Sequence, residues 1–235
     1  MKNNQPLQLG RLVGLQVGRV QLHSMPESRR TDSEGAMWIS GIYKSAASPA
    51  RVTRNGIAGD EQADLENHGG PDNVILAYDA AHYPLWRERL QMPELSYGGF
   101  GENFTVEGFS DEDVCIGDIW EAGDLRLQVT QARQPCFKLA RRMGTPDIVR
   151  MVMETSWGGW YLRVLHDGIA EVGMPIQLVQ RFHPQWSVAR AVQTMYGRRR
   201  DIGSARQLAA LPELSTRWKN ELVLLDQQSQ QAQQQ

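Results

Sequence analysis

Short apolar segments separated by glycine turns are the feature that most constrains how this chain can fold. In these segments apolar and polar residues alternate or form brief apolar runs, as expected for short strands. Strands are expected over 11–22, 37–43, 50–52, 74–78, 104–106, 114–119, 125–129, 160–165 and 176–179. Gly14 and Gly18 interrupt the first segment, where they predict a bulge or a barrel bend. The pattern predicts a mainly β fold, either a barrel or a sandwich.

Helical spacing is confined to a few segments. Helices are expected over 80–90 with Asp79 as N-cap, from 146 to about 154, and, after the pattern changes at Ser187, over 187–195, 204–211 and 215–225. The glutamine-rich end of the chain is predicted to be disordered. The expected organisation is a β domain over 1–182, a three-helix appendage over 183–226 and a disordered tail over 227–235.

Composition argues against two broad classes of protein. The formal net charge of the 235 residues is −2, so the chain lacks the cationic excess of a nucleic-acid coat, and stable nucleic-acid binding is not expected. No apolar stretch is long enough to span a bilayer. Only four of the 25 basic residues are lysines: Lys2, Lys44, Lys138 and Lys219. Arginine binds oxyanions bidentately, so a local phosphate or acidic-ligand site stays open beside the commoner explanation, solvated surface arginine.

The two cysteines, Cys115 and Cys136, are too few for a disulfide framework and lack the spacing of a metal-binding pair. The first residues do not have the pattern of a signal peptide. A cytoplasmic location, where a reactive thiol stays reduced, is therefore expected. Cys115 alternates like a strand residue, which favours a place in the core.

Cys136 is expected where a strand turns into a helix. The alternation over 125–129 predicts the strand, Pro135 ends it, and helical spacing resumes over 137–143. The positive end of a helix and neighbouring cations such as Arg133 favour a thiolate over a thiol. A thiolate placed there suits a nucleophile or a ligand of a soft metal. The alternative, a buried structural cysteine, is about equally consistent with the spacing.

Glycine-rich or junction segments could converge on this cysteine. They are 68–72, 99–103, 133–136 and 158–160. Glycine in such loops lets backbone amides approach a ligand closely, although no dinucleotide-binding or phosphate-loop motif occurs. Simpler explanations exist for three of them: His68 as a loop histidine bonding its own turn, Glu102-Asn103 as a turn cap, and Gly158-Gly159 as a plain turn.

Five short motifs then occur in one order along the chain. They are Gly59-Asp60-Glu61-Gln62, His68-Gly69-Gly70-Pro71-Asp72, Phe100-Gly101-Glu102-Asn103, Gly117-Asp118 and Gln134-Pro135-Cys136-Phe137-Lys138. Each is weak alone, but the ordered set is specific and resembles the MOSC domain family, named for the C-terminal domain of molybdenum cofactor sulfurase. The three-helix end resembles the appendage of YiiM-type proteins. The resemblance extends from about Gly10 to Asp226.

This resemblance implies a β-barrel in which Cys136 ligates molybdenum or carries sulfur, with the pterin of the molybdenum cofactor in a groove lined by the glycine loops. The residues it implies for holding the cofactor are His68, Gly69, Gly70, Asn73, Phe100, Gly101, Glu102, Asn103, Arg133, Gln134 and Lys138. The implied activity is reduction of N-hydroxylated compounds such as 6-N-hydroxylaminopurine. An external electron-donor protein is then needed because no flavin or iron–sulfur motif is present. A homodimer is left open.

Two other hypotheses remain at this stage. A sulfur transferase would carry a persulfide on Cys136 and needs a nucleophilic thiolate but no bound pterin. A non-catalytic carrier would store the cofactor in the barrel and dock a partner through the three helices. The role of the appendage is not decided by its sequence.

Overall fold

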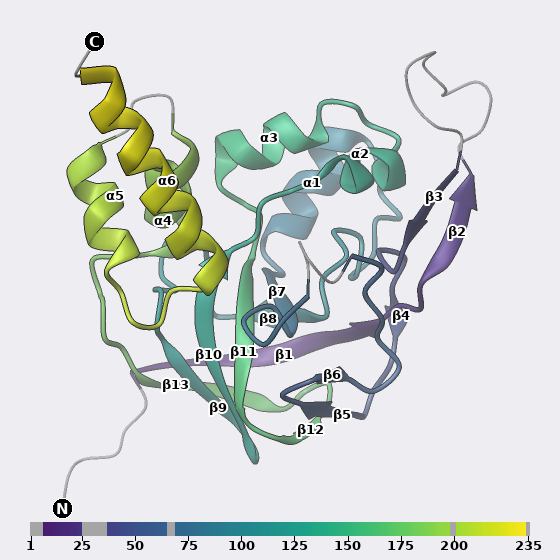
Figure 1. The fold of residues 1–235 in the computed structure, drawn as a ribbon. Helices are drawn as coiled ribbons and strands as arrows, with labels where there is room; N and C mark the ends of the chain where they lie inside the picture. Colours follow the sequence, from purple (N-terminus) through teal and green to yellow (C-terminus); the bar gives the residue numbers. More distant parts are fainter. Residues whose placement is uncertain (1–6, 25–36, 65–68, 198–200, 234–235) are drawn as a thin grey trace, which may run out of the picture.

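Seven strands close into a mixed β-barrel in this computed structural model, which describes residues 7–24, 37–64, 69–197 and 201–233 (Figure 1). The barrel strands are β1 (Gln8–Val17), β7 (Ile75–Asp79), β8 (Phe104–Glu107), β9 (Ile119–Ala122), β10 (Leu125–Ala132), β11 (Trp160–His166) and β13 (Pro175–Gln180). Their order is β13-β9-β10-β11-β7-β8-β1, and β1 closes the barrel by pairing with β13. Only β7 and β8 pair in parallel among these strands. The sequence-based choice between barrel and sandwich is thus resolved as a barrel.

Shorter strands surround the barrel. They are β2 (Gln21–Ser24), β3 (Met37–Ser40), β4 (Ser45–Ala46), β5 (Ala50–Thr53), β6 (Gly56–Ile57) and β12 (Gly168–Ala170). The predicted strand over 11–22 is split between β1 and β2 at 18–20, where the Gly18 amide donates to the Asp60 carboxylate at 2.8 Å instead of to a strand. A Cβ at Gly18 would lie 2.4 Å from the Gly41 carbonyl oxygen, so this position requires glycine. The predicted bulge is present, since the pairing of β1 with β8 changes register between Leu12 and Gly14.

The predicted strand over 114–119 begins only at Ile119, where β9 starts. Before it, the chain makes a turn in which the Asp118 carboxylate accepts a hydrogen bond from the Cys115 amide at 2.9 Å. A local side-chain bond of this kind competes with strand pairing, which explains the shorter strand.

Helices occupy two places around the barrel (Figure 1). They are α1 (His82–Leu90), α2 (Phe137–Met143), α3 (Ile148–Thr155), α4 (Val188–Tyr196), α5 (Ile202–Ala209) and α6 (Thr216–Gln233). The first three gather over one end of the barrel, and α4–α6 form a bundle beside it. The predicted N-cap at Asp79 is wrong, because α1 begins at His82 with Ala81 as its N-cap residue; the Asp79 carboxylate instead accepts from the Ala81 amide at 2.9 Å.

The predicted disordered tail differs in the structure, because α6 continues through Gln233. Glutamine is among the better helix formers, and polar residues four apart on a helix can bond. The Gln230 amide donates to the Asp226 carboxylate at 3.2 Å, which is such a pair. The prediction of disorder from the low-complexity composition is therefore wrong over 227–233.

The three-helix bundle is firmly attached to the barrel. Its buried side chains, Trp218 among them, belong to the same hydrophobic cluster as the barrel core. The Ser215 amide donates to the Thr130 carbonyl on β10 at 3.1 Å, and the Thr216 amide donates to the Asp72 carboxylate at 2.9 Å. The start of α6 is therefore fixed against the strand that leads to Cys136.

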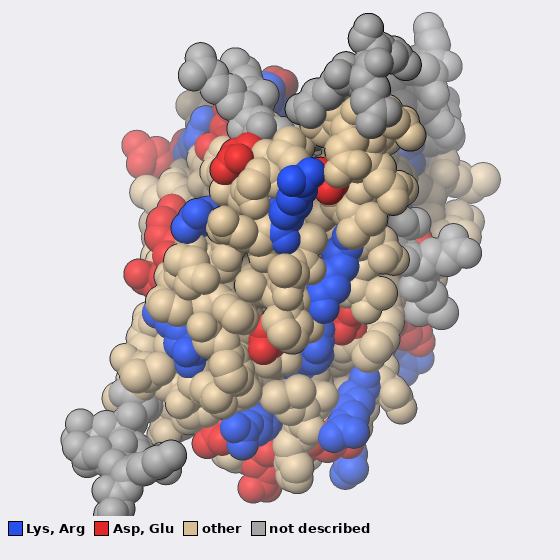
Figure 2. Space-filling model, turned by 60° about the vertical axis from the view of Figure 1, so that its left-hand side comes forward, with Lys and Arg blue, Asp and Glu red and all other residues tan. Residues whose placement is uncertain are grey.

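The described helices include none with the length and apolar character needed to cross a membrane. On the face in Figure 2 the basic and acidic side chains are interspersed, in keeping with the formal net charge of −2.

Candidate functional site

Cys136 lies at the strand-to-helix junction that the sequence predicted. Strand β10 ends at Ala132 and α2 begins at Phe137, so Cys136 is the N-cap residue, with extended backbone angles of φ −114° and ψ 171°. Its side chain is half-buried, and it forms no disulfide. The alternative of a sealed structural cysteine is thereby disfavoured.

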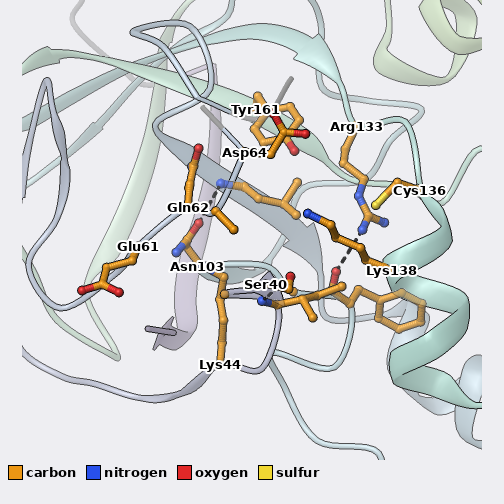
Figure 3. A pocket seen from close by; sticks show the side chains of 16 residues that line it. Ser40, Lys44, Glu61, Gln62, Asp64, Asn103, Arg133, Cys136, Lys138 and Tyr161 are labelled. Atoms are coloured by element: carbon orange, nitrogen blue, oxygen red, sulfur yellow. Dashed lines mark hydrogen bonds between the residues drawn. The ribbon is translucent and has the colours of Figure 1, made fainter. Parts of the chain in front are cut away.

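A small cavity of about 90 Å³ opens beside Cys136 (Figure 3). The predicted site residues that line it are Phe100, Gly101, Asn103, Arg133, Cys136 and Lys138. The sequence-based prediction missed others on its wall: Ser40, Gly41, Ile42, Lys44, Glu61, Gln62, Ala63, Asp64, Leu76 and Tyr161. Two of these, Glu61 and Gln62, were visible only as part of the motif that carried the family resemblance, which also contains Asp60. Lys44 and Tyr161 stand in no motif that could have indicated them.

Arg133 supplies a buried positive charge at this cavity. Its side chain is almost fully buried, and Nη2 donates to the Phe100 carbonyl at 3.3 Å. The buried Nη1 atom has no hydrogen-bond partner within the described chain. Lys138, the second residue of α2, brings its ammonium toward the same space (Figure 3). Two cations at one small cavity favour an anionic ligand.

The Gly158-Gly159 pair holds Arg133 in place and is more than a plain turn. The Arg133 amide donates to the Gly159 carbonyl at 2.8 Å. A Cβ at Gly158 would lie 2.5 Å from the Arg133 carbonyl oxygen, and Gly159 has φ +76°, which side chains rarely adopt. Backbones this close require glycine.

Lys44, Asp60 and Asn103 form a buried polar cluster, of which Lys44 and Asn103 line the cavity at Cys136 (Figure 3). Asp60 pairs with the Lys44 ammonium and accepts from the Asn103 amide at 2.9 Å and the Gly18 backbone at 2.8 Å. Burial lowers the pKa of Lys44, and the Asp60 charge opposes that fall. Asn103 also accepts from the Leu76 amide at 3.1 Å, so its side chain mainly ties β1 to β7.

Glu102 was implied as a cofactor-binding residue, but it is fully buried behind the glycine loop and lines none of the described cavities. Its carboxylate accepts from the Gly98 amide at 2.6 Å, the Phe100 amide at 3.1 Å and the Thr105 hydroxyl at 3.0 Å. The Tyr83 hydroxyl is a further donor to it. Glu102 shapes the loop over 98–101, which in turn forms the cavity wall.

The remaining predicted residues lie in flanking cavities or outside the described chain. Gly69, Gly70 and Asn73 line a second cavity of about 410 Å³. Gln134 lines a third, of about 340 Å³, on the other side of Cys136. His68 falls outside the described residues. Both flanking cavities share wall residues with the one at Cys136, so the predicted site is brought together as a row of adjoining spaces.

The two cysteines differ sharply in environment. Cys115 is 2% exposed, as its alternation predicted, and burial raises its pKa to about 11.

In protein made without cofactor, we expect iodoacetamide at pH 8 to label Cys136 first and to reach Cys115 only after denaturation. Peptide mass spectrometry of native and denatured samples checks this. Native labelling of Cys115 with Cys136 untouched would contradict the assignment.

A closed mixed barrel carrying a cysteine at the entry to a helix, with a glycine loop and two cations beside it, defines a MOSC-domain protein. The MOSC domain family matches residues 64–177, and the YiiM-like, 3-alpha helix domain matches residues 186–223. The chain belongs to the YiiM-like family of MOSC-domain proteins, as the following similarities also show.

The matches cover different shares of the relatives' lengths. An uncharacterized protein, YflK of Bacillus subtilis (strain 168), is 40% identical over 187 residues, which are 79% of this chain and 84% of YflK. Protein YiiM of Escherichia coli (strain K12) is 37% identical over 132 residues, 55% of this chain and 59% of that protein. A protein named Reductase from Gibberella moniliformis (strain M3125 / FGSC 7600) is 36% identical over 182 residues, 76% of this chain but only 32% of its own length.

Solved structures agree with this assignment. The crystal structure of YiiM from Geobacillus stearothermophilus is similar with a TM-score of 0.76 and 32% identity, covering 92% of this chain and 99% of that one. The crystal structure of YiiM from Escherichia coli gives a TM-score of 0.70 at 26% identity, covering 81% of this chain and 90% of that one.

Proposed function

We propose that this protein is a reductase of N-hydroxylated compounds that uses the molybdenum cofactor, with Cys136 as the protein ligand of the metal. The similarity to a protein named Reductase supports the reaction class. The MOSC domain supports the cofactor. The observation that carries the proposal is the half-buried Cys136 thiol in a cavity that also presents Arg133 and Lys138.

The residues present fit the cofactor. Arg133 Nη1 is a buried donor without a partner in the described chain, which suits an anionic group. Gln62 Oε1 and Asn73 Oδ1, in the adjoining second cavity, are buried acceptors without partners there, which suits the donor edge of a pterin. The cavity at Cys136 alone is too small for a pterin, whereas the adjoining spaces together reach the usual range for ligand sites, about 300–1,000 Å³.

A metal at this position would not be held by a protein cage. The described residues contain no cluster of three or more His, Cys, Asp or Glu side chains suited to a metal ion. Cys136 would therefore be one ligand among those that the organic part of the cofactor brings. A thiolate is a soft ligand that suits a molybdenum centre.

When bound, the cofactor would supply the two-electron redox chemistry, and the protein would position and tune it. Reduction of an N-hydroxyl group takes two electrons and two protons, breaks the N–O bond and releases the oxygen as water. The electrons come, in this proposal, from a separate redox protein in the cytoplasm. Arg133 and Lys138 would hold the anionic groups of the cofactor by charge and would repel cations.

Tyr161 lines both the cavity at Cys136 and the third cavity, and its hydroxyl bears a proton. Burial raises the pKa of Tyr161, and the Arg133 guanidinium beside it opposes that rise. The phenol therefore stays protonated at neutral pH and can donate a hydrogen bond into the cavity.

Purified from a host that makes the cofactor, the wild-type protein should contain about one molybdenum per chain, and Cys136→Ala should lose it. Loss follows because, among the described residues that line the cavity, Cys136 alone offers a soft ligand. Cys115→Ala is the matched control and should keep the metal. The measurement is metal analysis by mass spectrometry together with reduction of 6-N-hydroxylaminopurine in a reconstituted electron chain.

Metal retained by Cys136→Ala would contradict the ligand assignment. An added sulfur on Cys136, in preparations without metal or pterin, would instead indicate sulfur transfer. Stoichiometric cofactor without turnover of any hydroxylamine would indicate a carrier.

A further inference from the structure

The cavity of about 340 Å³ on the far side of Cys136 is built by both parts of the molecule. The strand-to-helix junction contributes Gln131, Gln134, Pro135, Cys136 and Phe137, and other segments contribute Asp64, Tyr161, Arg217 and Trp218. The last two belong to α6 of the three-helix bundle. Cys136, Tyr161 and Asp64 also line the small cavity, so the two spaces adjoin at the cysteine.

The bundle forms a rigid wall of this cavity. The Ser215 hydroxyl donates to the Gln131 side-chain oxygen and accepts from the Trp218 amide at 3.2 Å. The Tyr196 hydroxyl of α4 donates to the Gln134 side-chain oxygen at 3.0 Å. Both glutamines of the cysteine segment are thus held by hydroxyls of the bundle, and Trp218 is 1% exposed. Ordered side chains of this kind can discriminate between ligands.

The chemistry of the walls limits what can enter. Phe137 is 55% exposed and lies with Tyr161 and Trp218 on the cavity wall, which suits a flat ring. Because the Gln134 oxygen is engaged by Tyr196, its amide nitrogen remains as a donor. The Arg217 guanidinium is 38% exposed and bonds Glu221 through Nε at 2.8 Å. Arg217 and Tyr161 line the same cavity, and burial raises the pKa of Tyr161 while the Arg133 and Arg217 charges oppose that rise.

We infer that this cavity binds the substrate, that the three-helix bundle completes it, and that Arg217 is a specificity-determining residue favouring planar N-hydroxylated compounds with an acidic group at the end away from the N–O bond. The inference rests on the proposed function for the reaction, but the preference itself is a property of binding. It assigns a role to the bundle, because a barrel alone would lack the Arg217 and Trp218 wall.

The test uses the cofactor-loaded protein without an electron donor, so that binding is measured without turnover. The probes are benzamidoxime and 4-carboxybenzamidoxime, which differ only in the acidic group. Titration calorimetry of the wild type should give about tenfold tighter binding of the carboxylated probe, because an arginine–carboxylate pair in a partly dry cavity is charge-assisted. Arg217→Ala should abolish this preference, and Arg217→Lys should restore part of it.

Arg206→Ala is the matched control, since Arg206 pairs with Asp226 on the exposed side of the same bundle. It should leave both dissociation constants unchanged. Thermal unfolding and molybdenum content should be unchanged in all three variants, because the Arg217–Glu221 pair is an ordinary helix-surface pair.

A preference that survives in Arg217→Ala would overturn the inference, as would failure of the wild type to bind either probe. Loss of molybdenum in Arg217→Ala would also overturn it, since the cavity would then belong to the cofactor. If the binding preference holds but no donor supports turnover, the proposed reductase activity fails while this assignment of the cavity stands.

Discussion

Glu102→Ala should destabilise the protein by about 3–5 kcal/mol, the range for breaking a buried charged network. The side chain is fully buried and accepts from two backbone amides and from the Tyr83 and Thr105 hydroxyls. Removing it leaves these donors buried without an acceptor. For a chain of this size the melting temperature should fall by about 10 °C, and thermal or urea unfolding measures the change.

Two variants make this prediction specific. Tyr83→Phe removes one donor to Glu102 and the acceptor of the Gly99 amide at 3.1 Å, and it should cost about 1–3 kcal/mol, less than Glu102→Ala. Glu107→Ala, at an exposed position on β8, should change stability by less than about 0.5 kcal/mol. A Glu102→Ala protein with unchanged stability but no bound cofactor would show that Glu102 contacts the cofactor directly, against the placement found here.

Asp60→Ala should have a comparable effect, about 3–5 kcal/mol, because it leaves the Lys44 ammonium buried without its partner. The side chains of Lys44 and Asp60 are 8% and 5% exposed. Asp60 is also the acceptor for the Asn103 amide and the Gly18 backbone. Since Lys44 and Asn103 line the cavity at Cys136, cofactor content should fall together with stability.

The double variant separates the charge from the hydrogen bonds. Lys44→Met in the Asp60→Ala background should recover part of the lost stability, because the uncompensated charge is gone. Unfolding free energies of the wild type, Asp60→Ala, Lys44→Met and the double variant give the coupling free energy between Lys44 and Asp60. Additive effects of the two substitutions would contradict a buried ion pair.

The position of Cys136 could be predicted because its signals are local. Pro135 cannot donate to a strand ladder, and the residues after Cys136 have helical spacing, so the junction follows from neighbouring residues alone. The same holds for Cys115, whose strand-like alternation correctly predicted burial. The family resemblance selected the barrel over the sandwich, and the barrel is present. The helical spacing after Ser187 had already predicted the three-helix end, and the YiiM-like domain match agrees with it.

Other residues could not be placed in this way. Glu102 stands in the same motif as Phe100 and Gly101, yet its side chain turns inward, where Tyr83 on α1 supplies a donor. Gly158-Gly159 looked like an ordinary turn until the Arg133 backbone was seen packed against it. The spacing of residues along the chain does not predict a contact with a residue from a distant segment.

By itself the sequence determined the strand-to-helix junction at Cys136, the many short strands and the change to helices after Ser187, because periodicity and turn residues act over a few positions. Only the tertiary structure decided that Lys44, which pairs with Asp60, and Tyr161 line one cavity with that sulfur, and that α6 contributes to the wall of the next cavity. Contacts of this kind join distant segments. The bond between the Ser215 hydroxyl and the Gln131 side chain, for example, spans a sequence separation of 84. Such pairings depend on barrel closure and on burial of charge, which no local pattern encodes.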